Sequence, residues 1–245
     1  MNIILNGANG RMGLEVSAAI KKSDEMSIIA SIDKSYELVN AVQMTSFPAY
    51  DIGADAIIDF SHHSAIYEVA EYAEKFNTPV VLCTTGQTEE ELAKVQELAK
   101  KVPVFFSANM SMGVALLCEL AKKSAAVLPD AEIEIIEKHH SAKLDAPSGT
   151  ALMLANAIKK VRSALTFMLG RSGRREREKN EIGIHAVRAG SIVGEHEVMF
   201  ATKNEIITVS HSAMSRCVFA DGAIAAAKWI KNKPAGLYSM QDMIG

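Results

Sequence analysis

Short apolar runs alternate with amphipathic stretches along the N-terminal part of the chain. Glycine, aspartate or other polar residues bound each apolar run, which is typical of β-strands. The predicted strands are residues 3–5, 26–32, 56–60, 79–83 and 102–106. The stretches between them predict helices over residues 12–22, 64–75 and 89–101. Strands that alternate with helices form βαβ units, so this region is predicted to be an α/β domain with a doubly wound parallel sheet.

The pattern changes beyond Ser111, where strands and helices no longer alternate regularly. Helices are predicted over residues 113–127 and 150–162, and strands over 131–137, 182–188, 194–202 and 205–211. The short links between the last three strands favour a meander, so this region is predicted to be an α+β domain with a mixed sheet. An alanine-rich helix over 217–231 is expected to return to the first domain. The predicted domains are residues 1–109 with 217–245, and residues 110–216.

Composition limits the kinds of partner. The chain has 245 residues, of which 49% are hydrophobic and 22% charged, and its formal charge of −3 gives no overall attraction to nucleic acid or to an anionic membrane. No apolar stretch approaches the length of a membrane span. The N-terminal run has no basic region, so it predicts a strand and not a signal peptide. The 3 cysteines are far apart and form no CxxC pair, which favours a reducing, cytoplasmic environment.

A glycine-rich turn, Gly7–Gly13, follows the first predicted strand and opens the first predicted helix. Glycines at these spacings allow a tight turn, admit a pyrophosphate to the backbone and let helix and strand pack closely. Asp33 ends the second predicted strand, where a carboxylate can accept hydrogen bonds from an adenosine ribose. Lys34 could instead meet a 2′-phosphate, so the pair leaves NADH and NADPH both open. Turn formation and packing alone are the alternative explanation of the glycines.

Two later strand ends carry polar groups. Residues 83–86 and 107–111 each follow a predicted strand, and ligands of open α/β sheets bind outside the carboxyl ends of strands. These hydroxyl and amide groups could orient a nicotinamide ring or a substrate, and ordinary turn chemistry is the alternative. His62 and His63 follow another strand end, where surface-loop histidines are the favoured interpretation. No metal site is predicted, because no third ligand at a suitable spacing accompanies them.

The richest stretch in candidate chemistry is residues 137–150. His139 or His140 can exchange a proton near neutral pH, and Lys143 can hold a carboxylate or give up a proton. Because a helix is predicted to follow, the amides of Gly149 and Thr150 would lie at a helix N-terminus, which favours an anion. The simpler alternative is a helix cap with solvated histidines. The mixed-charge stretch 171–180 is interpreted as a solvated loop in preference to a phosphate clamp.

Several segments of the chain occur together in one characteristic order: Gly7–Gly13, Asp59–Ser61, Thr84–Gly86, Ala108–Val114, Glu137–Ala151, Arg188–His196 and Ser215–Arg216. In this order they resemble the dihydrodipicolinate reductase family, whose members are also called 4-hydroxy-tetrahydrodipicolinate reductases. The likeness covers essentially the whole chain, and the segment HHSAKLDAPSGTA is the most specific part of it.

The resemblance implies reduction of 4-hydroxy-tetrahydrodipicolinate by NADH or NADPH, giving tetrahydrodipicolinate with loss of water in lysine and diaminopimelate biosynthesis. It implies that His139 is an acid/base and Lys143 a proton donor, while His140, Gly149 and Thr150 hold a substrate carboxylate. It implies a Rossmann-like cofactor domain and a substrate domain whose sheet assembles a homotetramer. The implied cofactor contacts are Gly7, Ala8, Asn9, Gly10, Arg11, Met12, Asp33, Lys34, Cys83, Thr84, Thr85, Ser107, Ala108, Asn109 and Met110.

Some questions stay open at this point. Cys83 stands where the family often has glycine, and which of His139 and Lys143 acts directly on substrate is not decided.

Two other functions are the alternatives. A non-catalytic dinucleotide sensor would need the glycine turn and Asp33, but it would have no use for His139 and Lys143 beside an anion site. A different amino-acid-linked dehydrogenase is the nearest enzymatic alternative, and substrate profiling would distinguish it.

Overall fold

A computed structural model describes residues 1–37, 40–49 and 51–245, and the chain folds into two compact units. Unit 1 comprises Met1–Ser111 and Arg216–Gly245, and unit 2 comprises Met112–Ser215. The chain therefore leaves unit 1 once and returns to it.

The described residues of unit 1 form a seven-stranded parallel sheet in the order β12-β6-β5-β4-β1-β2-β3. Successive strands run outward from β1 in one direction and then from β4 in the other, so the order reverses between β1 and β4. Such a reversal opens a crevice at the carboxyl ends of the strands. The strands are β1 (Asn2–Asn6), β2 (Ser27–Ile32), β3 (Gln43–Met44), β4 (Ala56–Asp59), β5 (Val80–Leu82), β6 (Pro103–Phe106) and β12 (Gly236–Tyr238).

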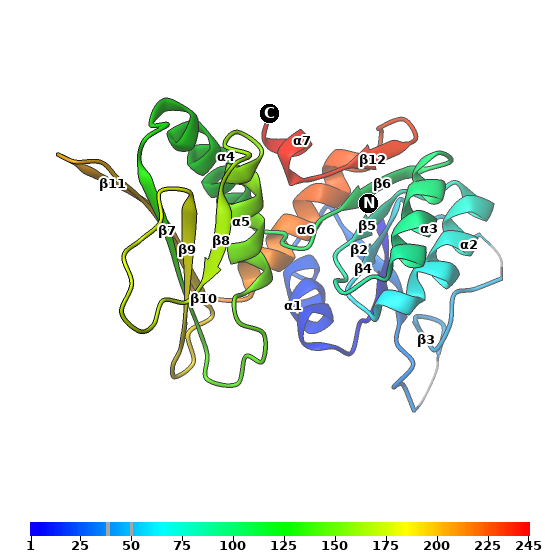
Figure 1. Ribbon diagram of the computed structural model, residues 1–245. Coiled ribbons are helices and arrows are strands. Elements are labelled where there is room, and N and C mark those ends of the chain that lie inside the picture. The colour runs from blue at the N-terminus through cyan, green and yellow to red at the C-terminus, as the bar shows by residue number, and fades with distance from the viewer. Residues whose placement is uncertain (38–39, 50) are drawn as a thin grey trace. The chain divides into compact units, whose positions relative to one another are not determined.

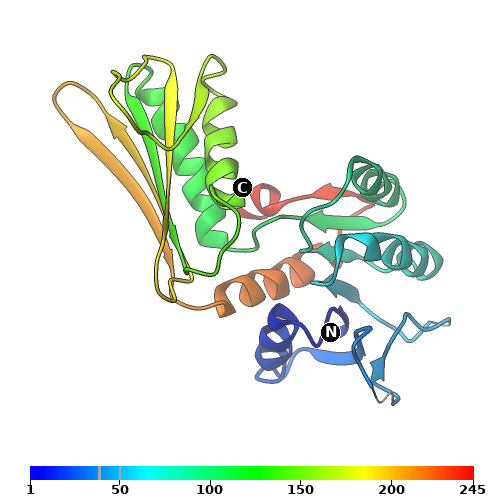
Figure 2. The same cartoon turned by 60° about the horizontal axis from the view of Figure 1, so that its bottom comes forward.

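Helices cover both faces of this sheet, as Figure 1 and Figure 2 show: α1 and α6 lie on one face and α2 and α3 on the other. The central strands read as unbroken apolar runs because both faces are covered. Ile3, Ile4 and Leu5 of β1, for example, are fully buried. The helices are α1 (Arg11–Ile20), α2 (Ile66–Phe76), α3 (Glu89–Ala99), α6 (Cys217–Ile230) and α7 (Met240–Ile244), with a 3-10 turn η1 (His63–Ala65) before α2. The unit is a Rossmann-like fold.

Unit 2 is a five-stranded mixed sheet with two helices packed on it. Side chains of β7 alternate between buried and partly exposed, which places one face of the strand on the helices. The order is β11-β10-β7-β9-β8, with β10 antiparallel to both of its neighbours and the other pairings parallel. The elements are α4 (Met112–Val127), β7 (Glu132–His139), α5 (Gly149–Lys159), β8 (Thr166–Leu169), β9 (Glu181–Arg188), β10 (Gly194–Ala201) and β11 (Ile206–Ala213).

Two sequence predictions about unit 2 are wrong, the second only in part. The strand expected to end at residue 137 continues through His139, so this histidine lies on the sheet and not in the following loop. The predicted meander forms only in part: β10 and β11 pair as an antiparallel hairpin, but β7 lies between β10 and β9, so β9 pairs with β7 and β8. Parallel pairing of β7 with β9 needs a long crossover, which here contains α5 and β8.

Residues 171–180 are a mostly exposed loop, as predicted, but three of its four arginines form ion pairs with residues of the sheet. Arg171 and Arg175 both pair with the buried Glu181, at 3.0 and 2.5 Å. Arg177 pairs with Glu134 of β7 at 3.1 Å. The loop is therefore held to the sheet by ion pairs.

Candidate active site

The glycine-rich turn joins β1 to α1 with very little space around it. Gly7 has a φ of +76°, and a Cβ there would lie 2.5 Å from the carbonyl oxygen of Phe60. A Cβ on Gly13 would lie 2.2 Å from the carbonyl oxygen of Gly7. Both positions therefore require glycine. The turn places the N-terminus of α1, beginning at Arg11, at the edge of the sheet where β1 ends.

Asp33, just after β2, is tied to this turn. Its carboxylate accepts hydrogen bonds from the Asn9 amide at 2.9 Å and from the Ser35 amide and hydroxyl at 2.9 and 2.6 Å. Burial opposes ionisation of Asp33, but these hydrogen bonds prevail and hold its pKa below the usual value. Lys34 points its ammonium group at Glu68 of α2, 2.9 Å away.

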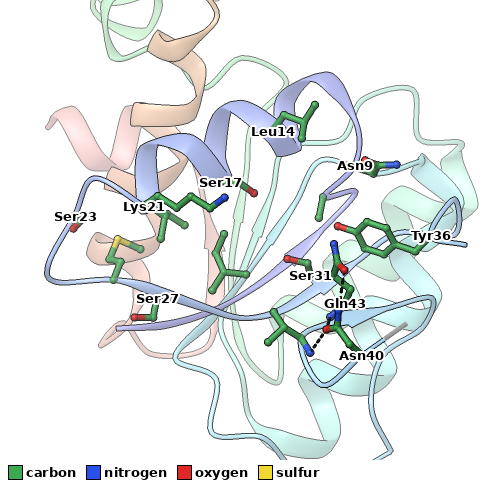
Figure 3. Close-up of a pocket in the computed structure, with 15 residues that line it drawn as sticks. Asn9, Leu14, Ser17, Lys21, Ser23, Ser27, Ser31, Tyr36, Asn40 and Gln43 are labelled. Carbon is green, nitrogen blue, oxygen red and sulfur yellow. Dashed lines mark hydrogen bonds between the residues drawn. The ribbon is translucent and has the colours of Figure 1, made fainter. Parts of the chain in front are cut away.

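A cavity of about 310 Å³ lies at the carboxyl ends of β1, β2 and β4, where the strand order reverses. It is lined by the glycine turn, by Asp33 and Lys34, and by Phe60–His62. A larger cavity, about 680 Å³, lies beside α1 and includes Ser17, Lys21 and Tyr36 (Figure 3). Only the smaller one of these two joins the glycine turn to Asp33, so it is the better candidate for the adenosine end of a dinucleotide.

A fully buried aspartate connects three neighbouring strand ends. Asp59 accepts hydrogen bonds from the Asn6 side chain at 2.7 Å and from the hydroxyls of Ser61 and Thr84, both at 2.5 Å. Burial dominates and raises the pKa of Asp59 despite these bonds. No separate role was predicted for Asp59, although an acidic residue at the end of the apolar strand 56–59 is a signal that the sequence contains. It orders the edge where β1, β4 and β5 end.

The other predicted cofactor contacts lie in the same unit. Thr84 is buried and committed to Asp59, whereas Thr85 is exposed. Burial raises the pKa of the Cys83 thiol well above its usual value, so this cysteine is a neutral packing group. At the end of β6, the Ser107 hydroxyl donates to the Asn109 carbonyl at 2.7 Å. Gly7, Ala8 and Met110 are buried, Ser107 and Met12 partly so, and Asn9, Gly10, Arg11 and Ala108 are exposed.

In unit 2, the alternation of β7 places Glu137 and His139 on the same buried face. The His139 Nδ1 atom lies 2.6 Å from Glu137 Oε2. Arg188, the last residue of β9, donates to both oxygens of Glu137, at 2.8 and 2.7 Å. The Ser148 amide at the start of α5 donates to Glu137 Oε1 at 2.9 Å. Three elements therefore meet at one carboxylate.

Burial and charge set the protonation states of this cluster. Burial would raise the pKa of Glu137, but the bonds from Arg188, His139 and Ser148 hold it below the usual value. Burial lowers the pKa of His139, although Glu137 partly offsets it. Burial, with the nearby His139, lowers the pKa of His196 to about 4. Both rings are therefore neutral near pH 7, with a proton acceptor available on His139.

The anion-binding part of the motif follows in the loop and at the start of α5. Lys143 pairs with Asp145 at 2.7 Å, and its charge also acts on His139. Gly149 and Thr150 are the first two residues of α5, capped by the Ser148 hydroxyl, so their amides lie at the positive end of the helix. Gly149 is exposed and no atom stands within 4 Å of where its Cβ would be. His140, directly after β7, is partly exposed.

The contacts of Glu137, Arg188 and His196 around His139 could not all be predicted from the sequence. Glu137 and His139 are two positions apart on β7, so their side chains lie on the same face of the strand. This could be predicted from the sequence only if the strand was taken to continue to residue 139. Arg188 was not visible in this way, because its approach depends on the pairing of β7 with β9. His196 comes from β10, with its ring centroid 5.1 Å from that of His139.

Two features are not found in the part of the chain that the structure describes. No three His, Cys, Asp or Glu side chains come together in a way that could hold a metal ion. Within the same residues, none of the helices has the length and apolar character needed to cross a membrane.

His63, predicted as a surface-loop histidine, instead binds Glu91 through Nδ1 at 2.8 Å.

A glycine turn at the reversal point of a parallel sheet, with an acid after the second strand, defines a nicotinamide-dependent oxidoreductase when a proton-transfer site accompanies it. Residues 1–110 match the family model described as dihydrodipicolinate reductase, N-terminus, and residues 113–244 match dihydrodipicolinate reductase, C-terminus. The chain belongs to the dihydrodipicolinate reductase family.

Individual relatives agree over the full length. The chain is 48% identical over 245 residues to the 4-hydroxy-tetrahydrodipicolinate reductase of Clostridium novyi (strain NT), covering 99% of this chain and 97% of that protein. It is 47% identical to the enzyme of the same name from Caldanaerobacter subterraneus subsp. tengcongensis, covering 100% and 98%. A dipicolinate-bound dihydrodipicolinate reductase from Paenisporosarcina sp. TG-14 has the same fold, with a TM-score of 0.80, 24% identity and 99% of each chain covered.

Proposed function

We propose that the protein reduces 4-hydroxy-tetrahydrodipicolinate to tetrahydrodipicolinate with loss of water, in lysine and diaminopimelate biosynthesis. The reaction consumes one NAD(P)H and one proton and releases NAD(P)⁺ and water. The observation that carries this proposal is the cluster in unit 2, where a neutral His139 and a cationic Lys143 accompany the positive end of α5. A dianionic substrate that gains a proton needs these groups together.

Unit 1 is proposed to hold the cofactor, which supplies the hydride. The glycine turn and the N-terminus of α1 would receive the pyrophosphate, because the positive end of a helix and its free amides favour an anion. Asp33 would accept hydrogen bonds from the adenosine ribose. Thr85, with the backbone of Thr84 and of residues 107–110, would position the nicotinamide end, since these residues lie at the carboxyl ends of β5 and β6.

Unit 2 is proposed to hold the substrate. His140, Gly149 and Thr150 would bind one carboxylate, with the helix dipole of α5 favouring the negative charge. Lys143 would approach the substrate by exchanging its partner Asp145 for a substrate oxygen. His139 and Lys143 would then carry the proton that accompanies the hydride. The solved Paenisporosarcina enzyme binds dipicolinate, a planar dicarboxylate of matching charge.

We propose that both NADH and NADPH are accepted and that NADH is preferred. Lys34 could contact a 2′-phosphate, but its ammonium group is already paired with Glu68. Glu68 also lines the cavity that holds Asp33. The carboxylates of Asp33 and Glu68 oppose the extra negative charge of NADPH, and the pairing of Lys34 with Glu68 weakens the attraction that this lysine would offer it.

We further propose a homotetramer assembled through the sheet of unit 2, in the cytoplasm. The edge strand β11 leaves the apolar Ile206 63% exposed, which suits a protein interface. Light scattering on the eluting protein measures the assembly directly, and a monomer would contradict it. The three cysteines are far apart in the sequence and form no CxxC pair, which favours a reducing compartment.

Activity is tested by coupling the protein to the aldolase-type condensation of pyruvate with aspartate semialdehyde. We expect loss of NADH and NADPH absorbance only when the condensation product is present. Failure of the folded protein to oxidise either cofactor would contradict the proposed function. Dipicolinate should inhibit competitively against the condensation product.

A further inference from the structure

We infer that Glu137 is a positioning residue that fixes the orientation and tautomer of the His139 ring. This inference rests on the proposed role of His139 in proton transfer. It concerns a group that lies behind the histidine and bears on the reaction only through it. The Glu137 carboxylate is fully buried, and Arg188 donates a hydrogen bond to each of its oxygens.

The Glu137 carboxylate has no freedom to rotate. Oε1 accepts from the Ser148 amide and from Arg188, while Oε2 faces His139 Nδ1 and accepts from the other Arg188 nitrogen. The side chain is fully buried, so water does not compete for these bonds. Arg188 is itself held by the carbonyl of Asp145 at 2.7 Å. Each partner of the carboxylate thus belongs to a fixed element or to a held side chain.

This arrangement decides which nitrogen of His139 carries the proton. An ionised carboxylate only accepts, so Nδ1 must donate and the neutral ring keeps its lone pair on Nε2. The opposite edge of the ring lies against Gly194 of β10, where a Cβ would stand 3.0 Å from Nε2. Glycine at 194 therefore leaves the space that this orientation of the ring needs.

The charged and titratable groups facing His139 come from several elements. Glu137 lies on its own strand, Arg188 on β9, His196 on β10 and Lys143 in the loop before α5. Glu137 favours the protonated ring, whereas the two cations oppose it. Removing the Glu137 charge would leave the two cations unopposed, and the pKa of His139 would fall further.

The test is Glu137→Gln, with Glu134→Gln as its control. Glu134 lies on the same strand and binds His185 at 2.8 Å and Arg177 at 3.1 Å, so its replacement disturbs a comparable Glu–His–Arg group away from His139. We expect Glu137→Gln to lower kcat on the order of 100-fold. In a plot of kcat against pH, the fall of kcat on the acid side (the acid limb) should move to lower pH, because the pKa of His139 falls. The KM for cofactor should not change. Glu134→Gln should leave both the limb and kcat nearly as in the unaltered protein.

The inference is overturned if the acid limb of the kcat–pH profile does not shift in Glu137→Gln, or if Glu137→Gln and Glu134→Gln lose the same amount of kcat. Two further measurements do not need Glu137→Gln to fold. Nitrogen-15 spectra of the unaltered protein should show neutral His139 with its proton on Nδ1, and a proton on Nε2 would refute the assignment. Gly194→Ala crowds the ring without removing a charge, so kcat should fall while the limb stays in place.

These outcomes are separable from failure of the proposed function. A fully active His139→Gln protein would remove His139 from the reaction. The nitrogen-15 spectrum would still report whether Glu137 sets the tautomer.

Discussion

The ammonium group of Lys34 lies 2.9 Å from the carboxylate of Glu68, and both side chains line the cavity that contains Asp33. The pair joins the loop after β2 to the first turn of α2. Both side chains are well exposed, so the pair contributes little to folding stability. The pair bears instead on cofactor binding, because Lys34 lines the cavity proposed for the adenosine end of the cofactor.

Replacing Glu68 should therefore shift cofactor preference. Glu68→Gln removes one negative charge and releases Lys34, so we expect the KM for NADPH to fall roughly 2- to 10-fold while that for NADH stays nearly constant. Lys34→Gln should raise the KM for NADPH. Side-by-side kinetics with both cofactors measure the ratio. An unchanged ratio in Glu68→Gln would mean that the phosphate does not approach Lys34.

His139 and Lys143 should affect turnover more than binding. We expect His139→Gln and Lys143→Gln each to lower kcat by about 100- to 10,000-fold, the range of acid–base catalysis. Thr150→Val should instead raise the KM for the condensation product, because it alters the carboxylate end of the site. Lys138→Gln is a matched control, since Lys138 neighbours His139 in sequence but pairs with Glu195 on the partly exposed face. A double His139 and Lys143 variant with normal turnover would refute the assignment.

Gly13 tests the glycine turn. Gly13→Ala places a methyl group against the carbonyl of Gly7 and the backbone of Ala8, which cannot move without disturbing β1. We expect unfolding to become easier by roughly 1–3 kcal/mol and the KM for NADH to rise. At Gly10 the added methyl would meet only the Gly7 carbonyl, at 3.2 Å, so Gly10→Ala should cost much less stability. Equal melting temperatures for the two variants would contradict this account.

The parallel unit was largely predictable because its signals are local. The glycine turn after β1 and Asp33 after β2 belong to one short stretch, and each buried strand is a contiguous apolar run. The two-residue β3 was not predictable in this way, because it carries no pattern of its own and exists by pairing with β2. The strand β12 likewise exists by pairing with β6.

The site in unit 2 was predictable only in part. The chemical groups of residues 139–150 are local, so the candidates could be found from the sequence. Their arrangement is not local, because Arg188 reaches Glu137 across 51 positions and Ser148 reaches His196 across 48. Ion pairs of Arg171 and Arg175 with Glu181 were missed for a related reason: a mixed-charge stretch does not reveal which of its charges fold back onto a strand.

His196 makes the stability of the protein depend on pH. Burial lowers its pKa to about 4, against an unfolded value near 6.5. Between these values the unfolded chain binds the proton and the folded chain does not, so the stabilisation present above about pH 6.5 is lost as the pH falls towards 4. We expect the free energy of unfolding to fall by about 2 kcal/mol from this residue between pH 7 and pH 5.

Urea unfolding at the two pH values measures this loss, and His196→Gln provides the comparison. A glutamine in place of His196 can still hydrogen-bond to Ser148, which lies 3.1 Å from the His196 Nε2 atom, but it does not titrate. The difference in unfolding free energy between pH 7 and pH 5 should therefore be smaller in the variant by about 2 kcal/mol. If both proteins lose the same free energy of unfolding, protonation of His196 does not destabilise the fold. Another group is then responsible for the acid sensitivity, and His139 is the next residue to replace.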